Sequence, residues 1–296
     1  MKYLLGVDTG GTKADFLLTT LNGGPVLEFS TESANAGTAT TGTAAAFDLG
    51  FKRLSGEVSL SDISHACLGV AGLHPGNHKK IDLQLRSALP SHLSETAIVV
   101  NDSVIGFHSA GKSQAGIALI AGTGSLSARI SGERISKTVG GAGAKFSDKG
   151  SSYWIGKKTI QHLLETIELR EPDQTLLLEF GIDVNDLEKA KWQLTELVNG
   201  FSQTEVAQVS KLTARLCQDH DWAQAIIESA ADHLATLVIG LNPQEEEVVL
   251  IGSLLNQNQS IRNQLIKKLV DFSITFVPAP NPVNGAIALL QRRFAG

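Results

Sequence analysis

The chain lacks the features that mark a membrane protein, a nucleic-acid-binding protein or a disulfide-rich scaffold. Its 296 residues include only two cysteines, Cys67 and Cys217, which lie far apart in the sequence. So few cysteines exclude a disulfide framework and suit a reducing compartment. The formal net charge of −5 argues against a surface for nucleic acid or for an anionic membrane. The apolar run at 234–241 is far shorter than the ~20 residues that span a bilayer.

The first residues do not resemble a secretory leader. Met1 and Lys2 are followed by only five apolar or glycine residues before Asp8 interrupts them. We therefore expect a cytoplasmic protein. With 42% apolar residues, the chain is long enough for two domains that each bury a core.

The most informative segment is 4–13, where an apolar run ends in Asp8 and two adjacent glycines follow between threonines. The N–H groups of such a glycine turn can cradle an anion. Asp8 could hold a hydrated Mg²⁺ that bridges to a phosphate. Taken alone, the segment supports a phosphate-binding turn and a glycine-rich hairpin with a capping aspartate about equally.

The residue pattern predicts an α/β protein in two halves. Strands are expected at 3–8, 14–20, 25–31, 66–71, 97–100, 116–121, 126–130 and 248–251. Helices are expected at about 39–55, 77–89, 171–220, 222–241 and 283–293, with another from near residue 151. The order strand, Gly/Thr turn, strand occurs at 4–18 and again at 116–130, which indicates a weak internal repeat.

Asp102 follows the predicted strand at 97–100, so it is expected at the carboxyl edge of the sheet, where α/β proteins bind ligands. A carboxylate there can take the proton from a substrate hydroxyl as it attacks a γ-phosphoryl group. The alternative is that Asn101 and Asp102 cap a helix, which is the commoner use of these residues in isolation. The two uses are compatible at adjacent positions.

Five motifs, in order along nearly the whole chain, resemble the actin, hexokinase and Hsp70 superfamily. They resemble in particular its N-acetylglucosamine kinase branch, which is grouped with the BadF/BadG/BcrA/BcrD ATPases. The matching segments are 8–13 (first phosphate motif), 120–125 (second phosphate motif), 141–156 (Gly-Asp-Glu-Gly-Ser stretch), 249–253 (adenosine motif) and 282–286 (closing Pro-x-x-Gly-Ala).

The resemblance implies an α/β fold of two ribonuclease H-like (actin-like ATPase) domains with an interdomain cleft. The domains would cover 1–110 and 111–296, with the last helix returning to the first domain. The implied activity is ATP-dependent phosphorylation of the 6-hydroxyl of an amino sugar, most simply N-acetylglucosamine. Glucosamine as the acceptor and a BadF-type ATPase switch without sugar kinase activity are the alternatives, and a sugar-binding module without catalysis is a third.

The resemblance also assigns roles to residues, with ATP and Mg²⁺ as cofactors and a small amino sugar as partner; a homodimer is left open. Asp8 would organise Mg²⁺, and Asp102 would be the general base. The sugar would contact Asn35, Gly72, Asp102 and Asp148. The nucleotide would contact Thr9, Gly10, Gly11, Thr12, Lys13, Gly122, Thr123, Gly124, Gly252 and Ser253.

Three positions depart from the family pattern. Lys149 stands where the family has the glutamate of Gly-Asp-Glu-Gly-Ser, which reverses a charge beside a predicted sugar ligand. Ala142 replaces an aromatic residue, and Ser253 replaces a frequent glycine. These changes bear on the identity of the sugar more than on phosphoryl transfer.

One further pattern is expected to be a coincidence. Segment 106–113 fits the Walker A pattern letter for letter, but that motif needs a strand directly before it and a helix directly after it. A strand-like run follows here at 117–121, so we expect a turn between domains.

Overall fold

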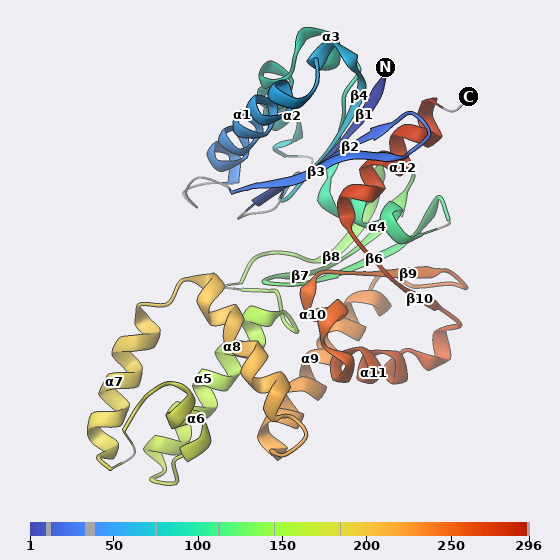
Figure 1. Cartoon of the computed structure of the whole chain (residues 1–296). Coiled ribbons are helices and arrows are strands. Elements are labelled where there is room, and N and C mark those ends of the chain that lie inside the picture. Colours follow the sequence, from blue (N-terminus) through green and yellow to red (C-terminus); the bar gives the residue numbers. More distant parts are fainter. Residues whose placement is uncertain are drawn as a thin grey trace.

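The computed structural model describes residues 1–9, 13–32, 39–74, 76–111, 113–144, 146–183 and 185–294. Two lobes are visible, each built on a mixed five-stranded sheet (Figure 1). The first sheet has the order β3-β2-β1-β4-β5. Its strands are β1 (Tyr3–Thr9), β2 (Lys13–Thr20), β3 (Pro25–Glu32), β4 (Ile63–Val70) and β5 (Ile98–Asn101). The second sheet has the order β10-β9-β6-β7-β8. Its strands are β6 (Ala115–Ala121), β7 (Ser125–Ser131), β8 (Arg134–Gly140), β9 (Glu247–Ile251) and β10 (Thr275–Pro278).

The two sheets have the same topology. In the first, β1, β2 and β3 form antiparallel hairpins, and β4 and β5 add in parallel beside β1. In the second, β6, β7 and β8 form the hairpins, and β9 and β10 add in parallel beside β6. The weak repeat predicted at 4–18 and 116–130 is therefore the start of a duplicated fold.

An aromatic cluster packs α1 against the sheet of the first lobe. The helices of this lobe are α1 (Ala39–Glu57), α2 (His78–Ala88) and α3 (Ser91–Ser94), with a 3-10 turn, η1, at Leu60–Asp62. Phe16 of β2 stacks on Phe29 of β3 with ring centroids 5.0 Å apart, and Phe47 and Phe51 of α1 pack edge-on against Phe16. Gly50 lets α1 approach so closely, because a Cβ there would lie 2.0 Å from the Phe16 ring.

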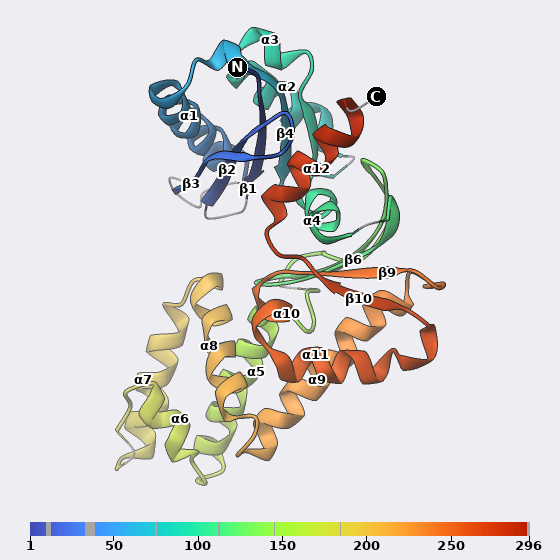
Figure 2. The same cartoon turned by 45° about the vertical axis from the view of Figure 1, so that its right-hand side comes forward.

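Two helices join the lobes. α4 (Asp102–Ala110) follows β5, and α12 (Pro282–Phe294) ends the described chain. Both views show α12 beside α4 and the first sheet (Figures 1 and 2). A Cβ at Gly285 of α12 would lie only 1.7 Å from the Ile105 carbonyl oxygen of α4. One buried cluster combines side chains of both sheets with these helices, including Leu4, Cys67, Ile251 and Ile287.

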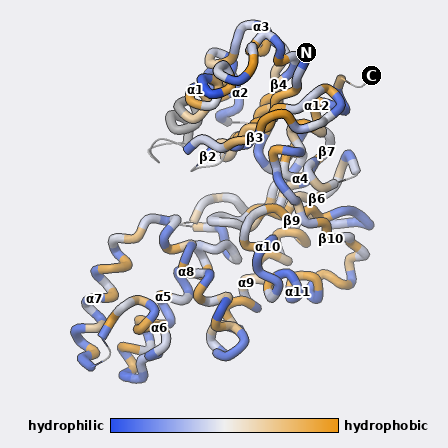
Figure 3. Tube along the Cα trace, viewed as in Figure 1, coloured by the Kyte–Doolittle hydropathy of each residue, from blue (hydrophilic) through white to orange (hydrophobic). Residues whose placement is uncertain are grey.

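The remaining helices cover the second sheet and extend away from it. They are α5 (Ser152–Glu168), α6 (Gln174–Glu179), α7 (Leu187–Asn199), α8 (Gln203–Leu216), α9 (Asp221–Ile239), α10 (Ser253–Gln257) and α11 (Gln259–Lys268), with a 3-10 turn, η2, at Val270–Phe272. Hydrophobic residues gather along the strands and α12, and the outer helices carry more hydrophilic ones (Figure 3). Within the described ranges, no helix combines the length and the apolar character needed to cross a membrane.

The Walker A match is a coincidence, as expected, but the predicted turn between domains is wrong for most of the segment. Residues 106–110 lie inside α4, which begins directly after β5, and β6 follows from Ala115. No glycine turn therefore stands between a strand and a helix there. The sequence did not predict β8 and β10, and it merged α6, α7 and α8 into one helical region.

Candidate active site

Asp8 and Asp102 lie close enough to interact electrostatically at the edge of the first sheet. Asp8 is on β1, and Asp102 is the first residue of α4 directly after β5. The pKa of the Asp8 carboxyl is raised to about 7, mainly by burial and then by the charges of Asp102 and Asp15. Burial also raises the pKa of Asp102 to about 6, against the lowering effect of the Ser103 backbone N–H. The sequence predicted these two carboxylates separately, and the fold brings them together.

Asn101 performs the capping role that the sequence left open. Its side-chain oxygen accepts a hydrogen bond from the Ser103 N–H at 2.9 Å, and its amide nitrogen donates to the Leu73 carbonyl at 2.9 Å. The Ser103 N–H also lies 3.0 Å from one oxygen of Asp102. Since Asn101 caps α4, the second carboxylate oxygen of Asp102 is available for other chemistry.

The carboxylates fit a hydrated Mg²⁺. Asp8 and Asp102 are half-buried, and a nearby cation would stabilise the charged forms of both carboxylates. No group of three or more His, Cys, Asp or Glu side chains in the described residues could hold a metal ion. One or two carboxylates completed by water and phosphate are the environment that Mg²⁺ prefers.

The rest of the first phosphate motif is only partly described. Gly10, Gly11 and Thr12 lie outside the described residues, as does the predicted sugar ligand Asn35. The buried Thr9 hydroxyl donates to the Gly69 carbonyl at 2.9 Å, so it ties β1 to β4. The Lys13 ammonium pairs with Asp15 at 2.7 Å.

Gly72 lies near the carboxyl ends of β4 and β5. It follows β4 with a positive φ of 71°, and a Cβ there would meet no atom within 4 Å. Its carbonyl accepts a hydrogen bond from the Asn77 side chain at 3.0 Å. The adjacent Leu73 carbonyl accepts from Asn101, which places Gly72 close to Asp102 along the same edge.

The second phosphate motif is a tight turn between β6 and β7. The Gly122 N–H donates to the Gly124 carbonyl at 3.0 Å, and the Gly122 carbonyl accepts from the Ser152 N–H at the start of α5 at 2.8 Å. Gly252 of the predicted adenosine motif packs against the same turn. Gly252 has a φ of 103°, and a Cβ there would lie 2.4 Å from the Ala121 carbonyl oxygen. The turn, the start of α5 and the start of α10 therefore meet at one point.

Asp148 lies against this turn. It has a positive φ of 57°, and its side chain is buried. A Cβ at Gly124 would lie 2.8 Å from its Oδ2, and its Oδ1 has no hydrogen-bond partner. Burial raises the pKa of the Asp148 carboxyl. It is not among the groups that shift the pKa of Asp8 or Asp102, so its predicted contact with the sugar stays a prediction.

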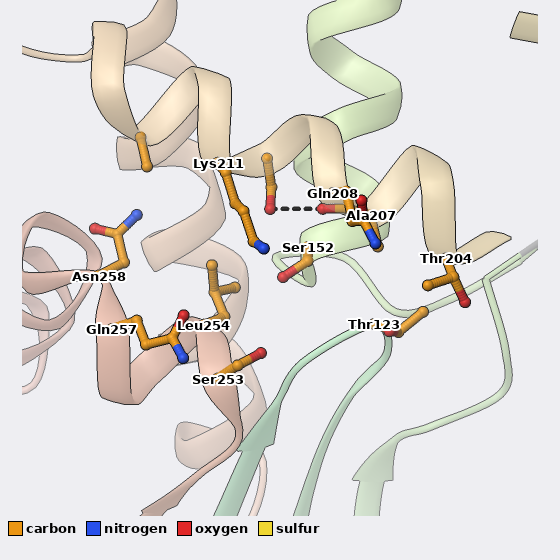
Figure 4. Close-up of a pocket in the computed structure, with 12 residues that line it drawn as sticks. Thr123, Ser152, Thr204, Ala207, Gln208, Lys211, Ser253, Leu254, Gln257 and Asn258 are labelled. Atoms are coloured by element: carbon orange, nitrogen blue, oxygen red, sulfur yellow. Dashed lines mark hydrogen bonds between the residues drawn. The ribbon is translucent and has the colours of Figure 1, made fainter. Parts of the chain in front are cut away.

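A cavity of about 370 Å³ lies beside the turn in the second lobe, between α8 and α10 (Figure 4). The predicted nucleotide ligands Thr123 and Ser253 both line it. Figure 4 shows Thr123 at one end, Asn258 at the other and the Lys211 ammonium between them. Thus two motifs far apart in the sequence contribute to one cavity.

Two residues of this cavity were missed by the sequence analysis. Lys211 of α8 is the charged residue among the described residues that line it. Asn258 Nδ2 is buried without a hydrogen-bond partner, while its Oδ1 accepts from the Ile261 N–H at 3.0 Å. The sequence offers no signal for Lys211, because a lysine on an amphipathic helix is typical of a solvated face. It offers none for Asn258 either, because an asparagine before a helix is typical of an N-cap, which this residue also is.

The duplicated topology and the glycine turn at β6–β7 place the chain in the class of two-lobed actin-like ATPase folds. The sequence profile of the BadF/BadG/BcrA/BcrD ATPase family matches residues 5–289. The chain belongs to this family.

The similarity to known proteins covers nearly the whole chain. A relative from Clostridium acetobutylicum, an N-acetylmuramic acid/N-acetylglucosamine kinase, is 28% identical over 91% of this chain and 90% of its own. An N-acetyl-D-glucosamine kinase from Dictyostelium discoideum is 25% identical over 91% of each chain. A solved structure from Chromobacterium violaceum, described as a candidate N-acetylglucosamine kinase, has a TM-score of 0.76 and 23% identity, covering 98% of this chain and 99% of that one. At this identity the structural likeness concerns the fold alone.

Proposed function

We propose that the protein is an ATP-dependent kinase that phosphorylates the 6-hydroxyl of an amino sugar, with N-acetylglucosamine as the first candidate. The observation that carries the proposal is the pair of half-buried carboxylates, Asp8 and Asp102, at the edge of the first sheet, where Asn101 caps α4. The family and the two kinase relatives support the same activity. The first domain comprises 1–110 together with α12.

In this proposal Asp102 is the general base. Its carboxylate accepts the proton of the sugar hydroxyl as the oxygen attacks the γ-phosphorus of ATP, and the bond to the β-phosphate oxygen breaks to release ADP. A pKa of about 6 keeps Asp102 ionised near neutral pH while making it a better proton acceptor than an exposed aspartate. The charges of Asp102 and Asp15, which help to raise the pKa of Asp8, also attract a cation, and bound Mg²⁺ would stabilise the ionised form of Asp8.

The remaining residues bind and orient the substrates. The nucleotide occupies the cavity beside α8, with its phosphates towards Thr123 and Gly122–Gly124 and its base towards Asn258. The first motif, from Thr9 to Lys13, contacts the terminal phosphates, and Gly252 and Ser253 border the nucleoside. Asn35, Gly72 and Asp148 contact the sugar. When bound, Mg²⁺ neutralises the charge of the β- and γ-phosphates.

The test is Asp102→Asn, which keeps the size of the side chain and removes the base. We expect sugar-dependent ADP formation to fall about 10²- to 10⁴-fold, while calorimetry still detects ADP binding. Asp48→Asn, on the exposed side of α1, is the matched control. Turnover by Asp102→Asn near the wild-type rate would exclude Asp102 as the base.

The acceptor is assigned with a panel of N-acetylglucosamine, glucosamine and glucose. We expect N-acetylglucosamine to stimulate ADP release most strongly. Stimulation mainly by glucosamine would identify a free-amine kinase. ATP hydrolysis that no sugar stimulates would favour the ATPase switch, and sugar binding without product would favour a binding module.

A further inference from the structure

The outward face of α5 carries aromatic and basic side chains at helical spacing. Tyr153, Lys157 and Gln161 recur every fourth residue, and Trp154 and Lys158 do the same one position later, so they share one face. The opposite face is closed by α8, since a Cβ at Gly156 would lie 1.9 Å from the Val206 carbonyl oxygen. The aromatic and basic face is therefore turned away from the core of the second lobe.

This face lines a second cavity, of about 190 Å³, together with residues of the preceding loop. Phe146, Ser147 and Lys149 supply the loop side. The Ser147 N–H donates to the Gly143 carbonyl at 2.8 Å, and the Ser125 hydroxyl donates to the Lys149 carbonyl at 2.9 Å. Because Ser125 is the first residue of β7, the cavity wall is tied to the end of the second phosphate turn.

The cavity is positively charged although the chain as a whole is acidic. Lys149, Lys157 and Lys158 line it, and no acidic residue of the described chain does. None of the three forms an ion pair among the described residues. The nearby His233 has a lowered pKa, owing to burial first and then to Lys149, with Asp232 and Lys158 contributing in opposite senses. The carboxylate of Asp232 pairs with Lys268 at 2.5 Å and with none of the three lysines.

Aromatic rings provide the other recognition element. Trp154 is half-buried, with His233 packed edge-on at 5.1 Å and the Lys158 ammonium 5.9 Å from its ring centre. Phe146 on the loop is 89% exposed. Aromatic rings can pack against the apolar face of a sugar, and ammonium groups bind phosphate or carboxylate.

We propose that this cavity binds a sugar that carries an anionic group. The choice of a sugar rests on the proposed kinase function, whereas the choice of an anion rests on the three lysines. The anionic group is the phosphate of a sugar 6-phosphate or the carboxylate of an acidic amino sugar. A phosphorylated product would bind there after the reaction, and an acidic acceptor would bind there before it.

Calorimetry on the full chain tests the proposal with four probes. They are N-acetylglucosamine 6-phosphate, N-acetylmuramic acid, neutral N-acetylglucosamine and inorganic phosphate. We expect Lys157→Glu/Lys158→Glu to lower the affinity for one or both anionic sugars by about tenfold or more, because like charges repel across a binding site. The affinity for neutral N-acetylglucosamine should not change. The matched control is Lys79→Glu/Lys80→Glu, an exposed lysine pair on α2 that lines neither of these two cavities.

The outcomes separate the parts of the proposal. Unchanged binding of both anionic sugars by the Lys157/Lys158 variant, or equal losses in the control, would overturn it. Phe146→Ser should weaken the binding of the anionic sugars but not of inorganic phosphate. If phosphate and sugar phosphate bind with equal affinity, and Phe146→Ser changes neither affinity, the cavity does not recognise the sugar. If the Lys157→Glu/Lys158→Glu variant has a raised KM for N-acetylmuramic acid, the cavity is an acceptor site. If that variant loses binding of N-acetylglucosamine 6-phosphate while its KM for the acceptor sugar is unchanged, the cavity is a product site. If no sugar is phosphorylated but the lysine-dependent binding remains, the kinase proposal fails and the anion site stands.

Discussion

At the residue scale, the raised pKa of Asp8 couples the candidate chemistry to the stability of the fold. The pKa of Asp8 is about 7 in the folded protein and near 3.8 in the unfolded chain, so between these values the folded state holds a proton that the unfolded state has released. The free energy of unfolding therefore falls as the pH rises through this window. Asp8 favours folding least at the pH at which catalysis would need it ionised.

Asp8→Asn removes this dependence. We expect the variant to be more stable than the wild type near pH 8 by on the order of 1–3 kcal/mol, and about equally stable near pH 4, where Asp8 of the folded protein is protonated. Urea unfolding in the presence of a chelator measures both values. Asp48→Asn, at an exposed position, should change stability by the same amount at both pH values. A stabilisation that does not grow with pH would contradict the raised pKa.

Lys211 gives a second prediction at this scale. Its ammonium lies between the Thr123 and Asn258 ends of the cavity (Figure 4). In the proposed arrangement of the nucleotide, this is the place of the α-phosphate. Lys211→Ala should lower the affinity for ATP and ADP by about tenfold, because a charge-assisted contact is lost. The affinity for adenosine, which has no phosphate, should not change. Lys189→Ala on α7 is the exposed control. Equal losses for adenosine and ADP would place Lys211 at the base instead.

At the scale of elements, the sequence predicted best where turns punctuate short strands. The hairpin signals at 22–25 and 122–125 coincide with the turns between β2 and β3 and between β6 and β7, and each ends on the first residue of the second strand. β8 was missed because it is an edge strand whose side chains are largely exposed, including Arg134 and Lys137, so it lacks an apolar alternation. β10 has only four residues and becomes a strand by pairing in parallel with β9.

The contact between α4 and α12 depends on the absence of a side chain at Gly285. A methyl group there would collide with the Ile105 carbonyl. We expect Gly285→Ala to lower the free energy of unfolding by about 1–3 kcal/mol, as overpacking does. Gly56→Ala is the matched control in α1, where a Cβ meets nothing within 4 Å. It should raise stability by about 0.5–1 kcal/mol, and equal effects of the two changes in urea unfolding would contradict the close approach.

At the scale of the whole molecule, the shared cluster around α4 and α12 couples the lobes. We expect calorimetry to show one unfolding transition, because neither lobe can unfold without exposing this cluster. A nucleotide that binds the second-lobe cavity should then shift the entire transition, by about 2.7 kcal/mol at 100 times its Kd. Two transitions, of which only one shifts, would show that the lobes unfold independently.

The sequence by itself predicted the glycine turn between β6 and β7, the places of Asp8 and Asp102 at strand ends, and the internal repeat, because these follow from glycine geometry and strand patterns over a few residues. Only the tertiary structure decided that Asp8 and Asp102 interact, that Asn101 caps α4 and that Asp148 faces Gly124. It also placed Lys211 in a cavity and gathered the α5 lysines around another. These relations join residues far apart in the chain or turn a surface-like helix face towards a neighbour, and local sequence patterns contain no information about such packing.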